Sequence, residues 1–564
     1  MLSYYGVDIA EKKKTILKNN QLTGRIKSII SGADKAATED SPAFKMSEYM
    51  LYFQTGDRTK FEAPYFKRRE NCYNLMVAYW LTEDEKYLTA LIDYISYICD
   101  EFTWCVPAHN RAAEVTSYDA VEQIDLFQAE TARLFSEIIM CVGEKLPSFI
   151  TVRMNDEIKK RIIAPFEKGA EFWWQTSHLN WATVCAAGCA IALLTFGTEG
   201  EINRLMPGFI NCMDAYLEGI FDDGCCREGS KYWTYGFWNY LKLATAIKLY
   251  TKGEIDYFNH PKAKKEALFL QKVRLSDSLV VCFADDIETF TFSPSMLSFM
   301  KSVYDDVALP DLKFADWTVN TPSVVELLWF ADDYKSEKLS LGTHFFEDSG
   351  WYIKRSENYS FAAKGGYNME PHNHNDAGSF MITVGDNVFM SDLGSAEYTR
   401  EYFDSKTRYT IVTNSSRGHS VPVINGEYQQ FGAEFCAENV KGDDNSFELD
   451  IESAYKSGIV NRINRRFDFN TFSIKLTDTF EPSVNTKTIT ERFITKIPPV
   501  INAGYVDMGV GKIKYDVNRY KPQISSEQYN GHRGLKVITA YIIDFVPVNS
   551  CETVFEFEFV PGVI

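Results

Sequence analysis

The feature that most constrains the fold is a change in the spacing of apolar residues near residue 338. Before that point apolar residues recur three and four positions apart, as in "NLMVAYWLTEDEKYLTALIDYISYI" (74–98), where TEDEK indicates a helix junction. After it the chain breaks into short runs rich in β-branched and aromatic residues, separated by Gly, Asn, Asp and Pro. The last run, "CETVFEFEFVPGVI", alternates like a strand. The helical spacing before residue 338 and the strand-like runs after it predict a helical part followed by a β-sheet part.

A chain of 564 residues is also too long for one ordinary hydrophobic core. We therefore predict an α+β multidomain protein. A helical domain over 1–338 consists of successive helical hairpins arranged as an array or toroid. An antiparallel β-sandwich follows over 339–564.

Composition excludes several classes of function. The net charge of −18 argues against a general nucleic-acid binder or a protein of anionic membrane surfaces. The sequence contains no run of about 18 apolar residues, so it predicts no membrane span. The start, "MLSYYGVDIAEKKKTILKNN", lacks the apolar stretch of a signal peptide, and the 12 cysteines show no paired framework. These features predict a cytoplasmic protein with reduced thiols, and they leave a homo-oligomer open.

The most informative motif of the β half is "HNHNDAGSF", which contains His372 and His374. In a strand the H-x-H spacing places both imidazoles on one face. With Asp392 and His419 they form a plausible His/His/Asp ligand set, which suits Zn²⁺. Satisfied structural histidines are the alternative. The neighbouring Asn and Gly residues also permit a turn, which would separate the two rings.

Three stretches of the helical half carry polar and aromatic residues suited to binding. They are "TWCVPAHNRAAEV", "EFWWQTSHLNWATVCAAG" and "FDDGCCREGSKYWTYGFWNY". Tyr232 and Tyr235 lie three residues apart and share a face if helical. Each stretch also has an ordinary structural interpretation, as a loop, a helix N-cap or an aromatic core stripe.

Taken in order, these motifs resemble the heparinase II/III-like polysaccharide lyases. The sequence runs from Asn180-Trp181 through Glu228-Gly229 and Tyr232–Gly236 to the H-x-H stretch, Asp392-Leu393-Gly394 and His419. The resemblance implies an (α/α) toroid packed on an antiparallel β-sandwich. It also implies β-elimination on uronate-containing glycans, such as heparan sulfate, chondroitin, hyaluronan or alginate.

The resemblance also assigns roles by position. It implies that Asn180 binds the uronate carboxylate and that Tyr235 and His372 are catalytic. His374, Asp392 and His419 then match the ligands of a structural divalent metal, usually zinc. His178 competes with Asn180 in the alignment, and Tyr232 competes with Tyr235. The candidates for substrate binding are Arg111, His178, Trp181, Glu228, Tyr232, Tyr402 and Tyr409.

The chemistry of elimination requires these residue types. A general base must remove the proton at C5, a general acid must protonate the leaving O4, and the carboxylate must be neutralised as negative charge develops. Local cations for an acidic substrate are offered by Arg111, Arg227, Lys231, Arg408 and Arg417.

Three other functions remain open on the sequence. A glycoside hydrolase would use Asp222 or Asp223 together with Glu228 as its two carboxylates. A cupin-like enzyme would use the metal catalytically. A non-catalytic sugar-binding protein would need neither a pair of catalytic carboxylates nor a catalytic metal.

Overall fold

The computed structural model describes residues 3–110, 119–319, 321–532 and 536–562. The chain divides into two compact units. The helical unit comprises Met1–Ile220, Trp233–Lys264 and Phe292–Ser336, and the β unit comprises Phe221–Tyr232, Lys265–Thr291 and Glu337–Ile564. The predicted limits, 1–338 and 339–564, stay a prediction. Two segments that the sequence analysis placed with the helices, 221–232 and 265–291, belong to the compact β unit.

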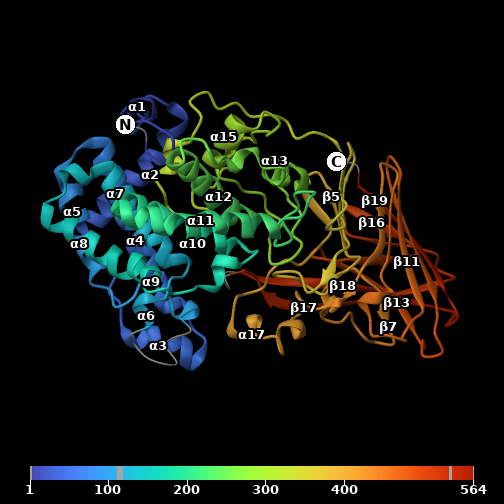
Figure 1. Ribbon diagram of the computed structural model, residues 1–564. Helices are drawn as coiled ribbons and strands as arrows, with labels where there is room; N and C mark the ends of the chain where they lie inside the picture. Colours follow the sequence, from blue (N-terminus) through green and yellow to red (C-terminus); the bar gives the residue numbers. More distant parts are fainter. Residues whose placement is uncertain (1–2, 111–118, 320, 533–535, 563–564) are drawn as a thin grey trace. The chain divides into compact units, whose positions relative to one another are not determined.

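Helices follow one another from the N-terminus and are coloured blue to green up to α15 in Figure 1, whereas the short α17 is orange. Their bounds are α1 Ile9–Ile16, α2 Thr23–Thr38, α3 Met46–Thr55, α4 Thr59–Thr82, α5 Glu85–Cys99, α6 Asp119–Glu122, α7 Leu126–Val142, α8 Ser148–Ile158, α9 Ala164–Glu167, α10 Asn180–Phe196, α11 Glu199–Gly219, α12 Ser230–Tyr250, α13 Pro261–Ala267, α14 Phe269–Val273, α15 Pro294–Val303, α16 Val325–Leu328 and α17 Arg400–Phe403. None of the helices described is long and apolar enough to cross a membrane.

Local sequence explains the hairpins of the helical unit. The helix α4 ends at Glu83, which adopts the left-handed conformation, and Asp84 then caps α5 by accepting a hydrogen bond from the Lys86 amide. This is the junction predicted from TEDEK. Helices α7 and α10 pack tightly because α10 carries Gly188, where a Cβ atom would lie 2.2 Å from the carbonyl oxygen of Ala129.

The β unit is built from antiparallel sheets. Its strands are β1 Gly342–Phe346, β2 Trp351–Arg355, β3 Ser360–Lys364, β4 Tyr367–Asn368, β5 Phe380–Val384, β6 Asn387–Met390, β7 Val423–Ile424, β8 Gly432–Cys436, β9 Glu438–Gly442, β10 Ser446–Asp450, β11 Arg462–Phe469, β12 Ile474–Glu481, β13 Ile489–Thr495, β14 Val500–Asn502, β15 Tyr505–Asp507, β16 Gly511–Lys514, β17 Tyr520–Asn530, β18 Val537–Pro547 and β19 Val554–Pro561. The sheet orders are β1-β2-β3-β5-β6, β14-β15-β16-β19-β12-β11-β10-β9, β17-β18-β13-β7 and β4-β8.

Aromatic rings from three of these sheets meet in the core. Phe380, which ends the H-x-H motif and starts β5, lies 5.0 Å from Phe467 of β11, 5.3 Å from Phe559 of β19 and 6.0 Å from Phe493 of β13, measured between ring centroids. The alternating burial of β12 and β19 shows one buried and one solvated face. The predicted fold class, a helical domain followed by an antiparallel β-sandwich, is confirmed.

The inserted segment 265–291 packs on the first sheet. The ring of Phe283 meets Trp351 of β2 edge-on at 5.2 Å, and the Ser360 hydroxyl of β3 donates to the carbonyl of Leu275. Strands β3 and β5 are consequently buried at every position. The segment therefore lies against the sheet from which the H-x-H loop emerges.

A buried arginine fixes two loops of the β unit. Arg465 of β11 is fully buried and binds the Asp478 carboxylate through Nε and Nη2 and the Glu491 carboxylate through Nη2. Its Nη1 donates to the carbonyl oxygens of Gly378 and Ser420, which lie in the H-x-H loop and directly after His419. One guanidinium thus holds both segments.

We expect Arg465→Ala to lower the free energy of unfolding by about 3–5 kcal/mol, because it leaves two buried carboxylates without their cation. The neighbour Arg466 is the matched control, since its side chain is 42% exposed while paired with Glu448 and Asp468. Arg466→Ala should lower the free energy of unfolding by less than about 1 kcal/mol. Urea titrations of the full chain measure both values, and equal losses would contradict the role of Arg465.

Candidate active site

The two histidines of the H-x-H motif occupy different surroundings. Residues 369–379 form turns between β4 and β5, and His372 has a left-handed backbone with φ of 58°. The His374 side chain is 0% exposed, whereas that of His372 is 24% exposed. The expectation that a strand places both imidazoles on one face is therefore wrong. The turn permitted by the flanking Asn and Gly residues separates them.

His374, Asp392 and His419 form a group that fits a metal ion. Each is fully buried and offers one ligand atom, and these atoms lie within 4.8 Å of one another. His374 Nδ1, Asp392 Oδ2 and His419 Nδ1 are buried without a hydrogen bond, although the last two lie 3.2 Å apart. Convergent unpaired ligand atoms in a dry interior are what a bound cation would satisfy. The three predicted ligands are thus brought together.

The other polar atom of each residue is held in place. Nε2 of His419 lies 2.8 Å from the Thr413 carbonyl oxygen, so Nε2 carries the proton and Nδ1 is left as a ligand. Asp392 Oδ1 accepts from the Gly394 amide at 2.8 Å. Nε2 of His374 lies 3.1 Å from Asp285 Oδ1. Each ligand is thereby oriented by a group behind it.

The ionisation states suit metal ligation. Burial lowers the pKa of His374 and so favours its neutral, ligating form. Burial opposes ionisation of Asp392, but the charge of His419 outweighs burial and lowers the pKa of Asp392 to about 2, while Asp392 in turn raises the pKa of His419, so a metal ion would displace the proton of His419. This carboxylate is therefore charged at neutral pH.

Asp285 is the residue of the site that the sequence analysis missed. Its Oδ2 lies 3.0 Å from Nδ1 of His372 and its Oδ1 lies 3.1 Å from Nε2 of His374. Oδ1 also accepts from the Tyr402 hydroxyl and, at 3.0 Å, from Nη2 of Arg408. Burial would raise the pKa of Asp285, but hydrogen bonds from the two histidines and the charge of Arg408 hold it well below its usual range. The carboxylate is therefore ionised.

Asp285 comes from the segment 265–291, which the sequence analysis assigned to the helical domain. The only trace in the sequence is the acidic pair Asp285-Asp286 inside the apolar run "VVCFADDIETF". Asp286 has a different task, because it accepts hydrogen bonds from the backbone amides of Ser230 and Lys231 at the start of α12. Two adjacent buried carboxylates thus support two parts of the site.

Tyr232 lies flat against His372. The ring centroids are 3.9 Å apart with an angle of 15° between the planes. The Tyr232 hydroxyl is 2.9 Å from that of Tyr398, and Nε2 of His372 is 3.6 Å from a Glu228 oxygen. Burial, followed by the charge of Asp285, raises the pKa of Tyr232, so its phenol stays protonated. Three of the predicted substrate-binding residues therefore surround His372: Glu228, Tyr232 and, through Asp285, Tyr402.

Tyr409 and the candidate cations are engaged with protein groups. The Tyr409 hydroxyl donates to the Asn373 side chain at 2.8 Å, and its ring stacks on Phe431. Arg408 donates hydrogen bonds to the Asp285 carboxylate and to the carbonyl oxygens of Asn373 and Tyr402. It therefore stabilises the fold around the site. The remaining cations pair as Arg227 with Tyr367, Lys231 with His532, and Arg417 with Glu527.

Asn180 and Tyr235 lie on two helices of the helical unit, α10 and α12, that pass close to each other. Asn180 is the first residue of α10, and Leu179, not Asn180, is the N-cap. Helix α12 passes close by because Gly236 carries no Cβ, which would lie 2.9 Å from Cβ of Asn180. The Tyr235 hydroxyl is buried without a hydrogen bond. Burial and then the charge of Glu130 raise the pKa of Tyr235, which keeps this phenol protonated.

The other predicted residues of the helical unit fall in different places. His178 is a surface residue, 57% exposed and 3.6 Å from Glu218. Trp181 contacts the rings of Trp173 and His109, each at 4.9 Å. Arg111 lies outside the described residues.

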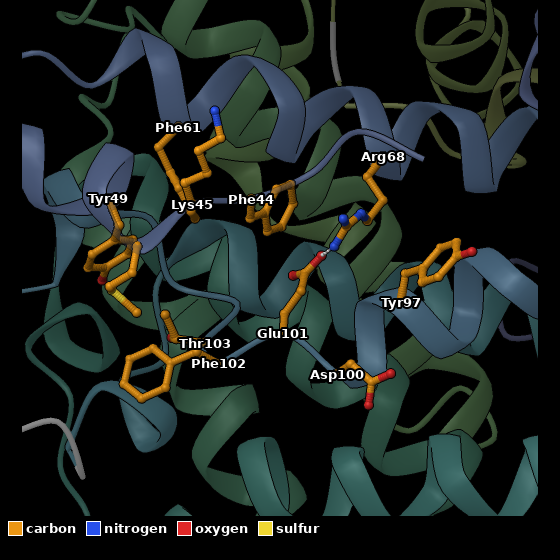
Figure 2. A pocket seen from close by; sticks show the side chains of 11 residues that line it. Phe44, Lys45, Tyr49, Phe61, Arg68, Tyr97, Asp100, Glu101, Phe102 and Thr103 are labelled. Carbon is orange, nitrogen blue, oxygen red and sulfur yellow. Dashed lines mark hydrogen bonds and ion pairs between the residues drawn. The ribbon is translucent and has the colours of Figure 1, made fainter. Parts of the chain in front are cut away.

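A cavity of 390 Å³ also lies in the helical unit, and none of the residues that line it is a predicted site residue (Figure 2). Arg68 and Glu101, an ion pair of 2.9 Å, form part of its wall. Phe44 stacks on Arg68 at 3.8 Å. The guanidinium is also bound by Ser41 and Pro42, so it serves the fold.

Comparisons with known proteins agree with this architecture. The heparan sulfate lyase HepC from Pedobacter heparinus shares the fold with a TM-score of 0.62 at 14% identity, covering 95% of this chain and 83% of that one. A heparinase III gives 0.61 at 12% identity, covering 99% and 93%. The chondroitin AC lyase of Streptomyces coelicolor A3 gives 0.55 at 9%, covering 96% and 83%. No curated protein matches at the level of sequence.

The fold and the buried His/Asp/His group define a two-unit protein with an (α/α) toroid and an antiparallel β-sandwich. Residues 340–489 match the family model of the heparinase II/III-like C-terminal region. This part of the β unit therefore resembles the heparinase II/III-like C-terminal region, and the resemblance drawn from the sequence is confirmed.

We expect His374→Ala to lose the bound divalent metal, because it removes one of three convergent ligand atoms. His372→Gln is the matched control, since His372 is two residues away and lies outside the ligand group. After dialysis against zinc and then metal-free buffer, elemental analysis should find one metal per chain in the wild type and in His372→Gln. Loss of the metal from His372→Gln would show that the group is assigned wrongly.

Proposed function

We propose that the protein is a polysaccharide lyase that cleaves uronate-containing glycans by β-elimination. The observation that carries the proposal is the setting of His372. Its Nδ1 is bound to the Asp285 carboxylate, its face rests on Tyr232, and its side chain is 24% exposed. The likeness to proteins named as heparan sulfate and chondroitin lyases supports the same chemistry.

His372 is suited to be the general base. A carboxylate can only accept a hydrogen bond, so in the neutral imidazole of His372 the proton is on Nδ1 and the lone pair is on Nε2. Nε2 is then the atom that takes the C5 proton of the uronate. The ring cannot tilt freely, because Tyr232 covers one face at 3.9 Å.

A tyrosine would complete the elimination as the general acid. Burial raises the pKa of both Tyr232 and Tyr235, so each phenol holds a proton that it can donate to the leaving O4. Among the described residues the Tyr232 hydroxyl is bonded to that of Tyr398, whereas the Tyr235 hydroxyl lies near Glu130 and makes no hydrogen bond of normal geometry. We therefore propose Tyr235 as the acid and Tyr232 as the support of the His372 ring. Asn180 is proposed to bind the uronate carboxylate.

The metal is proposed to be a structural zinc ion. Two imidazoles and a carboxylate are ligands typical of zinc, which would supply a fixed positive centre when bound. The ligand residues His374, Asp392 and His419 are all 0% exposed, which leaves no open path for a sugar to reach the ion. They would hold the H-x-H loop in place. This argues against the cupin-like alternative, in which the metal is catalytic.

The glycoside hydrolase alternative is not supported by the acidic residues that it requires. Asp223 accepts hydrogen bonds from the backbone amides of Cys225, Asp348 and Ser349, so its carboxylate closes a turn. Asp223 is therefore unsuited to be the second carboxylate beside Glu228, which leaves only Asp222 for that role. The substrate class remains the uronans: heparan sulfate, chondroitin, hyaluronan and alginate, together with their oligosaccharides.

The proposal is tested by incubating the purified protein with each uronan and following the ultraviolet absorbance of the unsaturated uronate product. We expect absorbance to rise on at least one of them, and not with His372→Gln. Release of sugar without any gain in absorbance would identify a hydrolase. The absence of both on every uronan would reject the lyase.

We expect Tyr235→Phe to lower kcat by about 10²–10⁴-fold, the usual contribution of a general acid, with the KM little changed. Tyr232→Phe is the matched control on the same helix, because it keeps the ring stack and loses only the bond to Tyr398. It should lower kcat by less than about tenfold, since one neutral hydrogen bond contributes about 0.5–1.5 kcal/mol. The reverse result in steady-state kinetics would move the acid to Tyr232.

A further inference from the structure

We propose that Asp285 is a positioning residue that fixes the tautomer of His372 while tying it to the metal ligand His374. The inference rests on the proposed function for its kinetic part only. One carboxylate serves both rings: Oδ2 faces Nδ1 of His372 at 3.0 Å, and Oδ1 faces Nε2 of His374 at 3.1 Å. Asp285 thus acts on the reaction through His372 and touches no substrate itself.

The two bonds set complementary tautomers. Because a carboxylate offers no proton, His372 must carry its hydrogen on Nδ1 and His374 must carry its hydrogen on Nε2. The lone pair of His372 is then on Nε2, where a base needs it. The lone pair of His374 is on Nδ1, which is buried without a hydrogen bond to the described residues and is therefore the atom that His374 offers to the group with Asp392 and His419. A single acidic side chain therefore assigns opposite tautomers to two histidines two residues apart.

Asp285 cannot easily give way. It is 0% exposed, and its Oδ1 is also held by the Tyr402 hydroxyl and by Nη2 of Arg408 at 3.0 Å. Arg408 in turn binds the carbonyl of Asn373, the residue between the two histidines. Among the described residues the hydrogen-bond donors are divided unevenly between the two oxygens of Asp285. Oδ1 accepts from three donors, whereas Oδ2 accepts from Nδ1 of His372 alone.

This unevenness makes the effect of Asp285→Asn specific. An amide has one oxygen and one NH₂ group, and the three donors at Oδ1 require the oxygen there. The NH₂ group then faces His372, which can accept its hydrogen bond only with an unprotonated Nδ1. The proton of His372 moves to Nε2, and the lone pair needed for proton abstraction is lost. The bond to His374 is kept, so the metal ligands stay in place.

The experiment uses the full chain with histidine labelled in ¹⁵N. Long-range proton–nitrogen correlations distinguish the two neutral tautomers, and the His372→Gln variant assigns the His372 signals among the eight histidines. In the wild type we expect His372 with its proton on Nδ1 and His374 with its proton on Nε2. The opposite tautomer at His372 would overturn the proposal, even if the variant at position 285 fails to fold.

In Asp285→Asn we expect the His372 proton on Nε2, one metal retained per chain, and kcat lowered at least about 10²-fold with the KM within about threefold. The matched control is Asp286→Asn, a neighbouring buried carboxylate that binds backbone amides instead of histidines. It should leave the His372 tautomer and the metal content unchanged. Loss of the metal from Asp285→Asn, or an unchanged His372 tautomer, would reject the proposal.

Failure of this inference can be told apart from failure of the proposed function. Tautomer and metal content are measured without any substrate. If the wild type cleaves no uronan but His372 changes tautomer in Asp285→Asn, the lyase is rejected and the role of Asp285 stands. If the wild type is a lyase and the His372 tautomer does not depend on Asp285, the proposed function stands and the role of Asp285 is rejected.

Discussion

The ionised carboxylate of Asp285 is the interaction on which the site depends. An isolated carboxylate in a dry interior is strongly destabilising, and it persists only where donors surround it. Here His372, His374, Tyr402 and Arg408 all point at it. His374 and Tyr402 are buried and would lose this acceptor without it, whereas Arg408 also donates to the carbonyl oxygens of Tyr402 and Asn373. The geometry of the exposed histidine is therefore determined by buried partners.

The fold supplies this carboxylate from an unexpected part of the chain. The segment 265–291 packs on β2 and β3 through Phe283 and Leu275, and its Asp285 contacts the H-x-H loop. The same segment also approaches Gly394 closely. A Cβ atom on Gly394 would lie only 2.4 Å from the Asp286 carbonyl oxygen, so a glycine is needed there. Asp392, two residues earlier, is thereby placed by the same contact. The segment consequently supports both the metal group and the His372 ring.

Much of this could be predicted from the sequence, for identifiable reasons. Periods of 3.6 and 2 gave the helical hairpins and the sandwich, because each layer must bury one face. His374, Asp392 and His419 could be grouped because ligand chemistry restricts the residue types. Asp285 could not be found, since its partners are 87 to 123 positions away and its neighbours are apolar. Strand alternation alone would have put both rings on one face, and the flanking Asn and Gly residues indicated the alternative, a turn, which occurs at the left-handed His372.

The peptide between the two histidines explains how their roles diverge. Arg408 holds the Asn373 carbonyl at 3.0 Å, and Tyr409 holds the Asn373 side chain at 2.8 Å. A non-glycine residue in the left-handed region costs about 1–2 kcal/mol, so His372 keeps φ of 58° only because its surroundings fix the backbone on the C-terminal side. Arg408 fixes that backbone and the Asp285 carboxylate with the same guanidinium. The strained turn and the bridging carboxylate are therefore two parts of one device, which directs one imidazole inward to ligands and the other outward.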